Sequence, residues 1–167
     1  MCSSDLKSPI GNLVPNPLIN LRLVLVGKQD YFYKRLKQYT KKIFGNNDNS
    51  VIFAGYVPDK DLAVFYRRAL AYVFPSFYEG FGLPPLEAMA QGCPVISSDQ
   101  TSLPEVLGQA ALYFNPYNKT EMRNKIEMVI NDEDLRYQLK NRGLEQVKKY
   151  SWQECAKKTL EIYQSIL

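Results

Sequence analysis

The sequence contains no histidine. This absence excludes from the chain every mechanism that needs an imidazole, including Ser-His-Asp catalysis, and every histidine-ligated metal site. The three cysteines, Cys2, Cys93 and Cys155, show no C-x-x-C spacing, so the sequence predicts neither a zinc site nor a disulfide framework. Any base must therefore be a carboxylate or a lysine of this chain, or come from another domain.

Long uncharged runs and strong charge asymmetry are also lacking. No uncharged run approaches the roughly 18 residues that a membrane span needs, and the opening MCSSDLKSP lacks the apolar segment of a signal peptide. The net charge of +4 comes from basic residues scattered along the chain, so nucleic-acid binding is not expected. With reduced cysteines, the chain is predicted to be cytoplasmic, and its charge is compatible with weak peripheral attraction to an anionic membrane.

The length of 167 residues is enough to bury a single core. Residues 1–20, which contain Pro9, Pro15 and Pro17, are predicted to be a poorly determined segment at a truncation edge. One domain is expected over residues 21–167. Its hydrophobic fraction of 46% and charged fraction of 23% are those of an ordinary globular protein.

Short apolar runs alternate with segments of helical periodicity along this domain. Strands are predicted at 21–27, 51–55, 71–75, 94–98 and 111–114. Helices are predicted at 32–43, 57–69, 83–91, from 103, at 119–130, 132–149 and 152–166. This alternation predicts an α/β fold with a Rossmann-like, doubly wound parallel sheet.

Several side chains are predicted to shape the helices. Hydroxyl or carboxylate caps are expected at Asp59 or Asp61, and in the S-x-x-E capping boxes that pair Ser102 with Glu105 and Ser151 with Glu154. An apolar stripe of Phe32, Leu36, Tyr39 and Ile43 predicts a buried helix face. The last helix carries a wide apolar stripe that packs either on its own sheet or against a second domain.

The stretch PSFYEGFGLPPLEAMAQGCPVISSD, residues 75–99, carries the chemistry. A loop that leaves a parallel strand and enters a helix is where open α/β sheets bind ligands, and its glycines let backbone N–H groups approach a phosphate. Pro84 and Pro85 fit the first helical turn. Glu79 and Glu87 flank the anion site but cannot bind it, so they must accept hydrogen bonds from hydroxyls, each worth about 1.5–3 kcal/mol. A nucleotide sugar satisfies this pattern.

Two other enzyme classes were weighed. Gly80 and Gly82 have the G-x-G spacing of a dinucleotide-binding oxidoreductase, with Asp99 as the ribose-binding acid, but Pro85 stands where the third glycine is needed. A glycosidase needs two carboxyl groups about 5–9.5 Å apart across a sugar, and a glutamate on a helix behind a phosphate-type loop argues against that arrangement.

The same stretch, continued by TSLPEVLGQAALYFNP, closely resembles the signature of the family 4 (group 1) retaining glycosyltransferases, and Glu79 and Glu87 meet its spacing of two glutamates with seven residues between them. The resemblance runs from about Leu21 to the end of the chain. It implies the C-terminal, donor-binding half of a two-domain GT-B enzyme.

The resemblance also implies residue roles. Glu79 should contact the donor sugar as the catalytic residue, and Glu87 should bind the ribose hydroxyls. Backbone N–H groups of the loop should hold the sugar and diphosphate, and the segment after the second strand should meet the base; these donor-binding residues are Gly80, Phe81, Gly82, Leu83, Tyr56 and Val57. The implied donor is a nucleotide-diphosphate sugar such as GDP-mannose, used in polysaccharide assembly without a metal or other cofactor.

The chain departs from the family pattern in one place. An arginine and lysine pair that clamps the diphosphate normally precedes the strand matching LRLVLVG, and residues 1–20 show no such motif. The acceptor-binding N-terminal half is missing as well. We therefore expect the chain to bind nucleotide weakly and to transfer nothing by itself; a non-catalytic nucleotide-binding module and an oxidoreductase domain are the alternatives.

Overall fold

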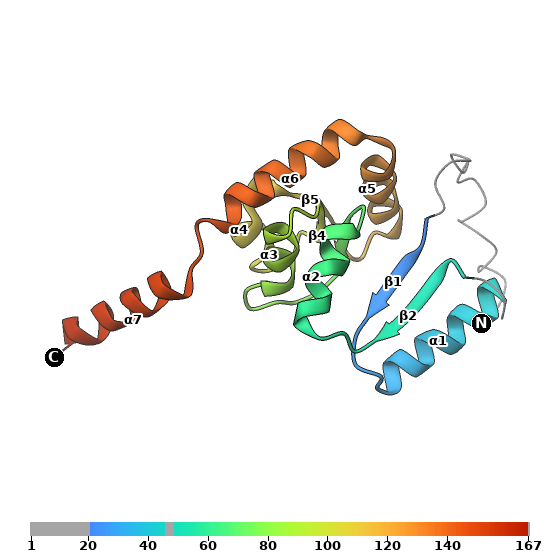
Figure 1. Cartoon of the computed structure of the whole chain (residues 1–167), viewed down its shortest axis with the longest axis horizontal. Coiled ribbons are helices and arrows are strands. Elements are labelled where there is room, and N and C mark those ends of the chain that lie inside the picture. The colour runs from blue at the N-terminus through green and yellow to red at the C-terminus, as the bar shows by residue number, and fades with distance from the viewer. Residues whose placement is uncertain (1–20, 46–48, 167) are drawn as a thin grey trace. The chain divides into compact units, whose positions relative to one another are not determined.

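The computed structural model describes residues 21–45 and 49–166 (Figure 1). The chain divides into two compact units, Met1–Val57 and Pro58–Leu167, and each is described by itself. The segment predicted over residues 1–20 lies outside the described residues, as do residues 46–48 of the predicted break at 45–50.

The first unit is a β-α-β motif. Strands β1 (Leu23–Val26) and β2 (Val51–Gly55) pair in parallel, and helix α1 (Tyr31–Phe44) connects them. Asp30 caps α1 by accepting a hydrogen bond from the N–H of Tyr33. The ring of Tyr33 packs edge-on against Phe53 of β2, with the ring centroids 5.4 Å apart.

Burial in this unit differs from the sequence prediction. The strand β1 was expected to be buried on both faces, but Leu23 is 52% exposed. The stripe of α1 expected to be buried is also exposed, from 45% at Leu36 to 73% at Phe32. The helix instead turns its Tyr33 side to the sheet. Among the described residues of this unit, β1 and β2 form a sheet of only two strands, which offers little surface to bury a helix.

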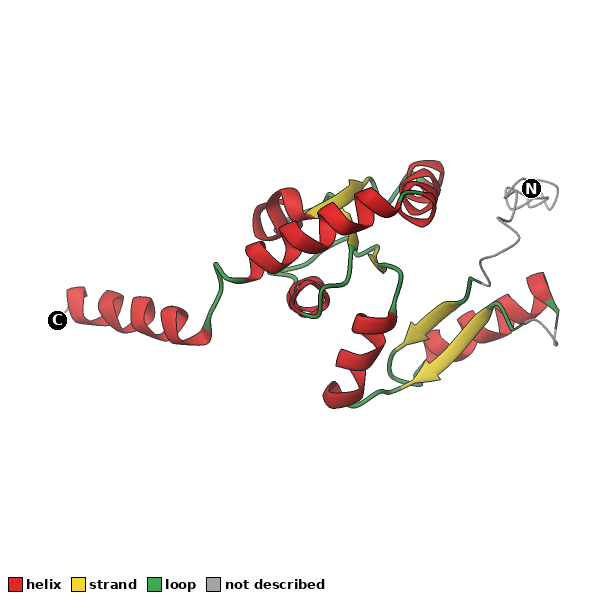
Figure 2. Ribbon diagram, turned by 45° about the horizontal axis from the view of Figure 1, so that its top comes forward, coloured by secondary structure: helices red, strands yellow, loops and turns green. Residues whose placement is uncertain are grey.

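The second unit is built on a three-stranded parallel sheet of order β3-β4-β5. Figure 2 shows strands of the chain in yellow and its helices in red. Its strands are β3 (Tyr72–Phe74), β4 (Val95–Ser98) and β5 (Ala111–Phe114). Its helices are α2 (Asp59–Arg68), α3 (Leu83–Ala90), α4 (Leu103–Leu107), the 3-10 turn η1 (Gly108–Ala110), α5 (Lys119–Asn131), α6 (Glu133–Val147) and α7 (Trp152–Ile166).

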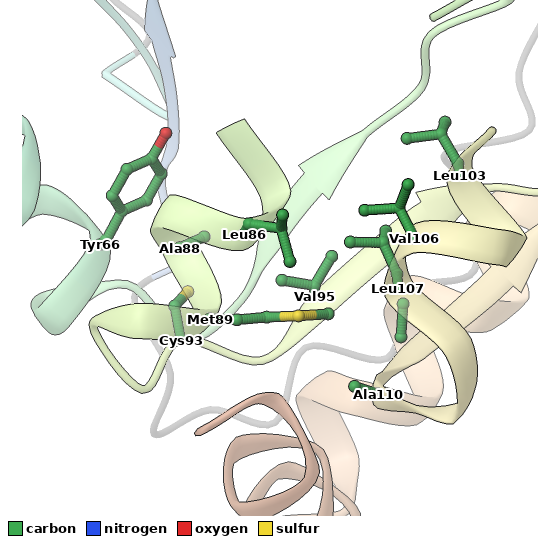
Figure 3. Close-up of a cluster of buried hydrophobic side chains, with 11 residues drawn as sticks. Tyr66, Leu86, Ala88, Met89, Cys93, Val95, Leu103, Val106, Leu107 and Ala110 are labelled. Carbon is green, nitrogen blue, oxygen red and sulfur yellow. The ribbon is translucent and has the colours of Figure 1, made fainter. Parts of the chain in front are cut away.

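The central strand β4 separates two hydrophobic clusters. Successive side chains of a strand point to opposite faces, so Val95 packs with α3 and α4 while Ile96 packs with Phe114, Val129 and Leu139. Figure 3 shows the first cluster, in which Met89 of α3 lies beside Val95. The side chains of Val95 and Ile96 are both fully buried. Helices therefore cover both faces, and the predicted α/β architecture is confirmed.

Two of the predicted helix caps are wrong and one is confirmed. Helix α2 begins after Pro58, with Asp59 and Asp61 in its first turn and no side-chain cap. Ser102 precedes α4 but makes no capping hydrogen bond, because its backbone is helical, at φ −76° and ψ −15°, where a capping residue is extended. Ser151 does accept a hydrogen bond from the N–H of Glu154, at 3.1 Å.

Helix α7 has no buried residue among those described, and Trp152 is 77% exposed. Docking of its apolar stripe on its own sheet is therefore not what the structure shows. None of the described helices combines the length and the apolarity that crossing a membrane requires.

Candidate functional site

The loop of residues 75–82 joins β3 to α3 and is held at its helical end by the core. The side chains of Leu86, Ala88 and Met89 on α3 are buried against β4 and α4. Because β3 and β4 are parallel neighbours, the loops that follow them leave from the same edge of the sheet. The segment of residues 99–102 after β4 thus lies beside the predicted site.

Gly82 fixes the point where the loop becomes a helix. It caps α3 with φ 104° and ψ 52°, a left-handed conformation that side chains with a Cβ rarely adopt. A Cβ added there would also lie 2.7 Å from Cδ2 of Leu103. Leu103 is fully buried, so it has little room to move away. Both constraints require glycine at this position.

Gly80 is under no such constraint. A Cβ at this position would meet no atom of the chain within 4 Å, and its φ is not positive. Chain packing among the described residues therefore gives no reason for a glycine here.

The N–H groups of the loop are available, but the helix adds few of its own. No hydrogen bond from the N–H of Gly80, Phe81, Gly82 or Leu83 forms within the described part of the chain. The next two residues, Pro84 and Pro85, have no N–H. The N–H groups that could meet an anion at this helix start therefore belong to the loop and to the first helical residue.

Glu79 is held in place by three hydroxyl groups. Its carboxylate Oε1 accepts a hydrogen bond from Oγ of Ser76 at 2.8 Å. Its backbone N–H donates to Oγ1 of Thr101 at 3.1 Å, and its carbonyl oxygen accepts from the same hydroxyl at 3.0 Å. Oγ of Ser102 lies 2.9 Å from that carbonyl and 3.2 Å from the carbonyl of Phe81. The Glu79 side chain itself is half-buried.

Glu87 lies one turn into α3 and is exposed. Behind it, Tyr66 and Tyr72 pack edge-on with their ring centroids 5.2 Å apart. Burial raises the pKa of Tyr66, and the negative charge of Glu87 raises it further. Burial likewise raises the pKa of Tyr72, so neither phenol competes with Glu87 as an anion at neutral pH.

The other predicted donor-binding residues fall in two groups. Phe81 and Leu83 are 42% and 45% exposed, and the ring of Phe81 packs edge-on against Tyr150. Tyr56 and Val57 follow β2 and belong to the first unit, where Tyr56 is 74% exposed. The structure brings the residues of loop 75–82 together with Glu87; the contact of Tyr56 and Val57 with the base stays a prediction.

Sequence reasoning missed the hydroxyl groups that hold Glu79. Ser102 was assigned to a capping box, and Thr101 and Ser76 were given no role. A signal was present: the polar run SSDQTS, residues 97–102, begins with the last two residues of β4, which pairs with β3, and the carboxyl ends of parallel neighbours meet at one edge. Which hydroxyl reaches Glu79 depends on loop conformation and could not be read from spacing.

Other features of the described surface lie away from this loop. One surface hollow sits at the junction of α5 and α6, lined in part by Asn124 and Asp132, and another lies beside η1 and α6, lined in part by Gln109 and Glu145. Within residues 21–45 and 49–166, no group of three or more acidic or cysteine side chains is placed to hold a metal ion.

Comparison with known proteins identifies the family of the chain. The sequence profile of the family described as glycosyl transferases group 1 matches residues 11–146. The O-antigen chain mannosyltransferase B of Escherichia coli is 44% identical over 119 residues, which are 71% of this chain and 31% of that protein. The chain thus spans about a third of this relative.

Two solved structures share the fold. The sucrose-phosphate synthase of Thermosynechococcus elongatus superposes with a TM-score of 0.77 and 29% identity over 87% of this chain and 38% of that one. HepE of Anabaena, solved with UDP, gives a TM-score of 0.74 at 19% identity over 88% of this chain and 41% of that one. The fold is that of one half of a GT-B glycosyltransferase, as the resemblance implied. On the family match and this identity, the chain belongs to the group 1 glycosyltransferases.

Proposed function

We propose that the chain is the donor-binding half of a retaining mannosyltransferase that uses a nucleotide-diphosphate sugar, with GDP-mannose as the donor, in polysaccharide assembly. One observation carries the proposal: free backbone N–H groups of Gly80 to Leu83 lie between two carboxylates, Glu79 and Glu87. N–H groups suit a diphosphate, and carboxylates suit the hydroxyls at its two ends. The 44% identity to a mannosyltransferase supports the choice of sugar.

In this proposal, different residues bind different parts of the donor. Glu87, exposed on the first turns of α3, accepts hydrogen bonds from the ribose hydroxyls. The N–H groups of residues 80–83 bind the diphosphate, and Tyr56 and Val57 contact the base through backbone atoms. Glu79 accepts hydrogen bonds from the sugar and stabilises the positive charge that develops on it, without acting as a nucleophile.

The resemblance to the retaining group 1 enzymes supports the mechanism. An oxygen of the donor phosphate takes the proton from the acceptor hydroxyl on the face where the bond to the leaving group breaks, and this step needs no histidine, a residue that the chain lacks. Attack on that face retains the anomeric configuration. The acceptor is held by a separate N-terminal half, so the 167-residue chain alone binds donor and transfers no sugar.

No metal has a part in this proposal. The diphosphate charge is met by backbone dipoles and by cations of the whole protein. Calorimetric titration with GDP in the presence of Mg²⁺ and again with EDTA should give the same dissociation constant. Binding that requires Mg²⁺ would show that a metal holds the diphosphate.

Two glutamate variants test the division of roles. Glu87→Gln should weaken both GDP and GDP-mannose by about tenfold, because each ribose hydrogen bond to a charged group contributes about 1.5–3 kcal/mol. Glu79→Gln should weaken GDP-mannose and leave GDP unchanged. Glu145→Gln, which changes a surface glutamate of α6 paired with Lys148, is the matched control. Loss of GDP binding in Glu79→Gln alone would contradict the assignment.

We propose that the protein is cytoplasmic and that α1 makes a peripheral contact with the membrane. This helix contains no acidic residue and carries Lys34, Arg35, Lys37, Lys41 and Lys42, beside an exposed apolar stripe. Such a helix is attracted to anionic lipids by about 1 kcal/mol per basic residue near the surface. Lys41→Glu combined with Lys42→Glu should reduce co-sedimentation with phosphatidylglycerol vesicles. Equal binding to phosphatidylcholine vesicles would contradict the proposal.

A further inference from the structure

Thr101 has a backbone conformation that its side chain disfavours. Its φ is 53°, and it is the one residue other than glycine with a positive φ among residues 21–45 and 49–166. Threonine is branched at Cβ, so it enters the left-handed region with a steric penalty that glycine or asparagine largely avoids. A costly conformation of this kind persists where the surrounding contacts hold it, and such residues gather at functional sites.

The contact made from this position is with the backbone of Glu79, 22 residues earlier in the chain. The single hydroxyl of Thr101 accepts from the N–H of Glu79 at 3.1 Å and donates to its carbonyl oxygen at 3.0 Å. It thus engages both polar backbone groups of one residue, as a partner strand would. The next hydroxyl, Ser102, adds a second donor to the same carbonyl at 2.9 Å.

These bonds act on one residue of a loop whose middle is exposed to solvent. The neighbours of Glu79 in the loop are exposed, Phe77 by 56% and Tyr78 by 80%. The carboxylate of Glu79 is oriented by Ser76, which belongs to the same loop. Thr101 and Ser102 therefore connect Glu79 to the segment after the buried strand β4, and of the two only Thr101 also accepts from the N–H of Glu79.

We propose that Thr101 is a positioning residue: its hydroxyl holds the backbone of Glu79 so that the carboxylate meets the sugar, but not the nucleotide, of the donor. This inference rests on the proposed function of the site. It makes Thr101 a determinant of how strongly the chain prefers a nucleotide sugar over the nucleotide alone. A residue that only kept the loop folded would affect both ligands equally, because residues 80–82 lie in the same loop.

The test uses the 167-residue chain and calorimetric titration with GDP and with GDP-mannose. Thr101→Val keeps the branched shape and the backbone penalty and removes only the hydroxyl. It should weaken GDP-mannose about tenfold and leave GDP within about twofold. Thr101→Ser retains the hydroxyl and should restore the wild-type ratio. Thr101→Gly relieves the backbone penalty without restoring the hydroxyl, so its ratio should match that of the valine variant.

The control is Thr159→Val, which removes a hydroxyl that donates to the carbonyl of Cys155 within α7 and should leave both affinities unchanged. Circular dichroism confirms that each variant is folded. If Thr101→Val weakens GDP and GDP-mannose equally, or neither, the positioning role is wrong while the donor site stands. If the wild-type chain binds neither ligand, the proposed function fails and the inference fails with it.

Discussion

The two glycines of the loop should respond very differently to the same substitution. Gly82→Ala places a Cβ 2.7 Å from Cδ2 of Leu103 and forces a side chain into φ 104°. Gly80→Ala adds the same Cβ where no atom of the chain lies within 4 Å. The pair therefore separates a glycine that the fold requires from one that the fold tolerates.

The magnitude can be estimated from the two separate costs. A non-glycine residue in this region costs about 1–2 kcal/mol, and overpacking a well-packed core costs about 1–3 kcal/mol, so Gly82→Ala should lower the free energy of unfolding by about 2–5 kcal/mol. For a chain of this size, each kcal/mol lowers Tm by about 2–4 °C, which gives a fall of about 4–20 °C. Gly80→Ala should stay within about 0.5 kcal/mol of the wild type.

Thermal denaturation followed by circular dichroism measures both variants under the same conditions. The steric reasoning depends on Leu103 being unable to move, since its Cδ2 is the end of a side chain that is fully buried. A Gly82→Ala variant with the wild-type Tm would show that Leu103 and the loop relax freely. A Gly80→Ala variant as unstable as Gly82→Ala would show that the loop packs differently from the structure.

Three further results are expected. Gly80→Ala should weaken GDP binding at least fivefold despite its unchanged stability, because its Cβ lies where the ligand approaches; unchanged GDP affinity would contradict that approach. In a Cys2→Ser background, a thiol reagent should label exposed Cys155 in the native chain within minutes, while Cys93, whose pKa burial raises to about 12, should react only on unfolding, as mass spectrometry of the labelled peptides would show. The raised pKa of Cys93 favours the protonated thiol in the folded state, so its contribution to the free energy of unfolding, up to about 4 kcal/mol, is complete below pH 9 and is lost as pH rises towards 12. In urea titrations, Cys93→Ala should therefore lose stability less steeply than the wild type over that pH range. An identical slope would refute the assignment.

Much of the fold follows from local patterns in the sequence. Every predicted strand and helix is present, because short apolar runs such as PVISS and amphipathic segments such as residues 119–130 carry unambiguous periodicity. Burial was less predictable. The apolar stripe of α1 was expected to be buried, yet the structure turns Tyr33 to the sheet and leaves Leu36 exposed. Periodicity identifies an apolar face but not what covers it.

The candidate site likewise contains residues that the sequence could identify and residues that it could not. The loop glycines and the two glutamates could be selected because each has a chemical reason at its position in the sequence. The hydroxyls that hold Glu79 could not, since Thr101 reaches it only through a left-handed backbone angle that spacing does not encode. Ser102 satisfied the pattern of a capping box, but its backbone is helical, at φ −76° and ψ −15°, where a capping residue is extended, and its hydroxyl donates to the carbonyl oxygen of Glu79.

The most direct test of the account is a calorimetric titration of the chain with GDP, UDP, ADP and NADH, repeated on Glu87→Ala. The account predicts that one nucleoside diphosphate binds, with GDP as the expected one, and that Glu87→Ala weakens it about tenfold or more. Binding of NADH that Glu87→Ala leaves unchanged, with no response to any diphosphate, would contradict the donor site and favour a dinucleotide-binding domain.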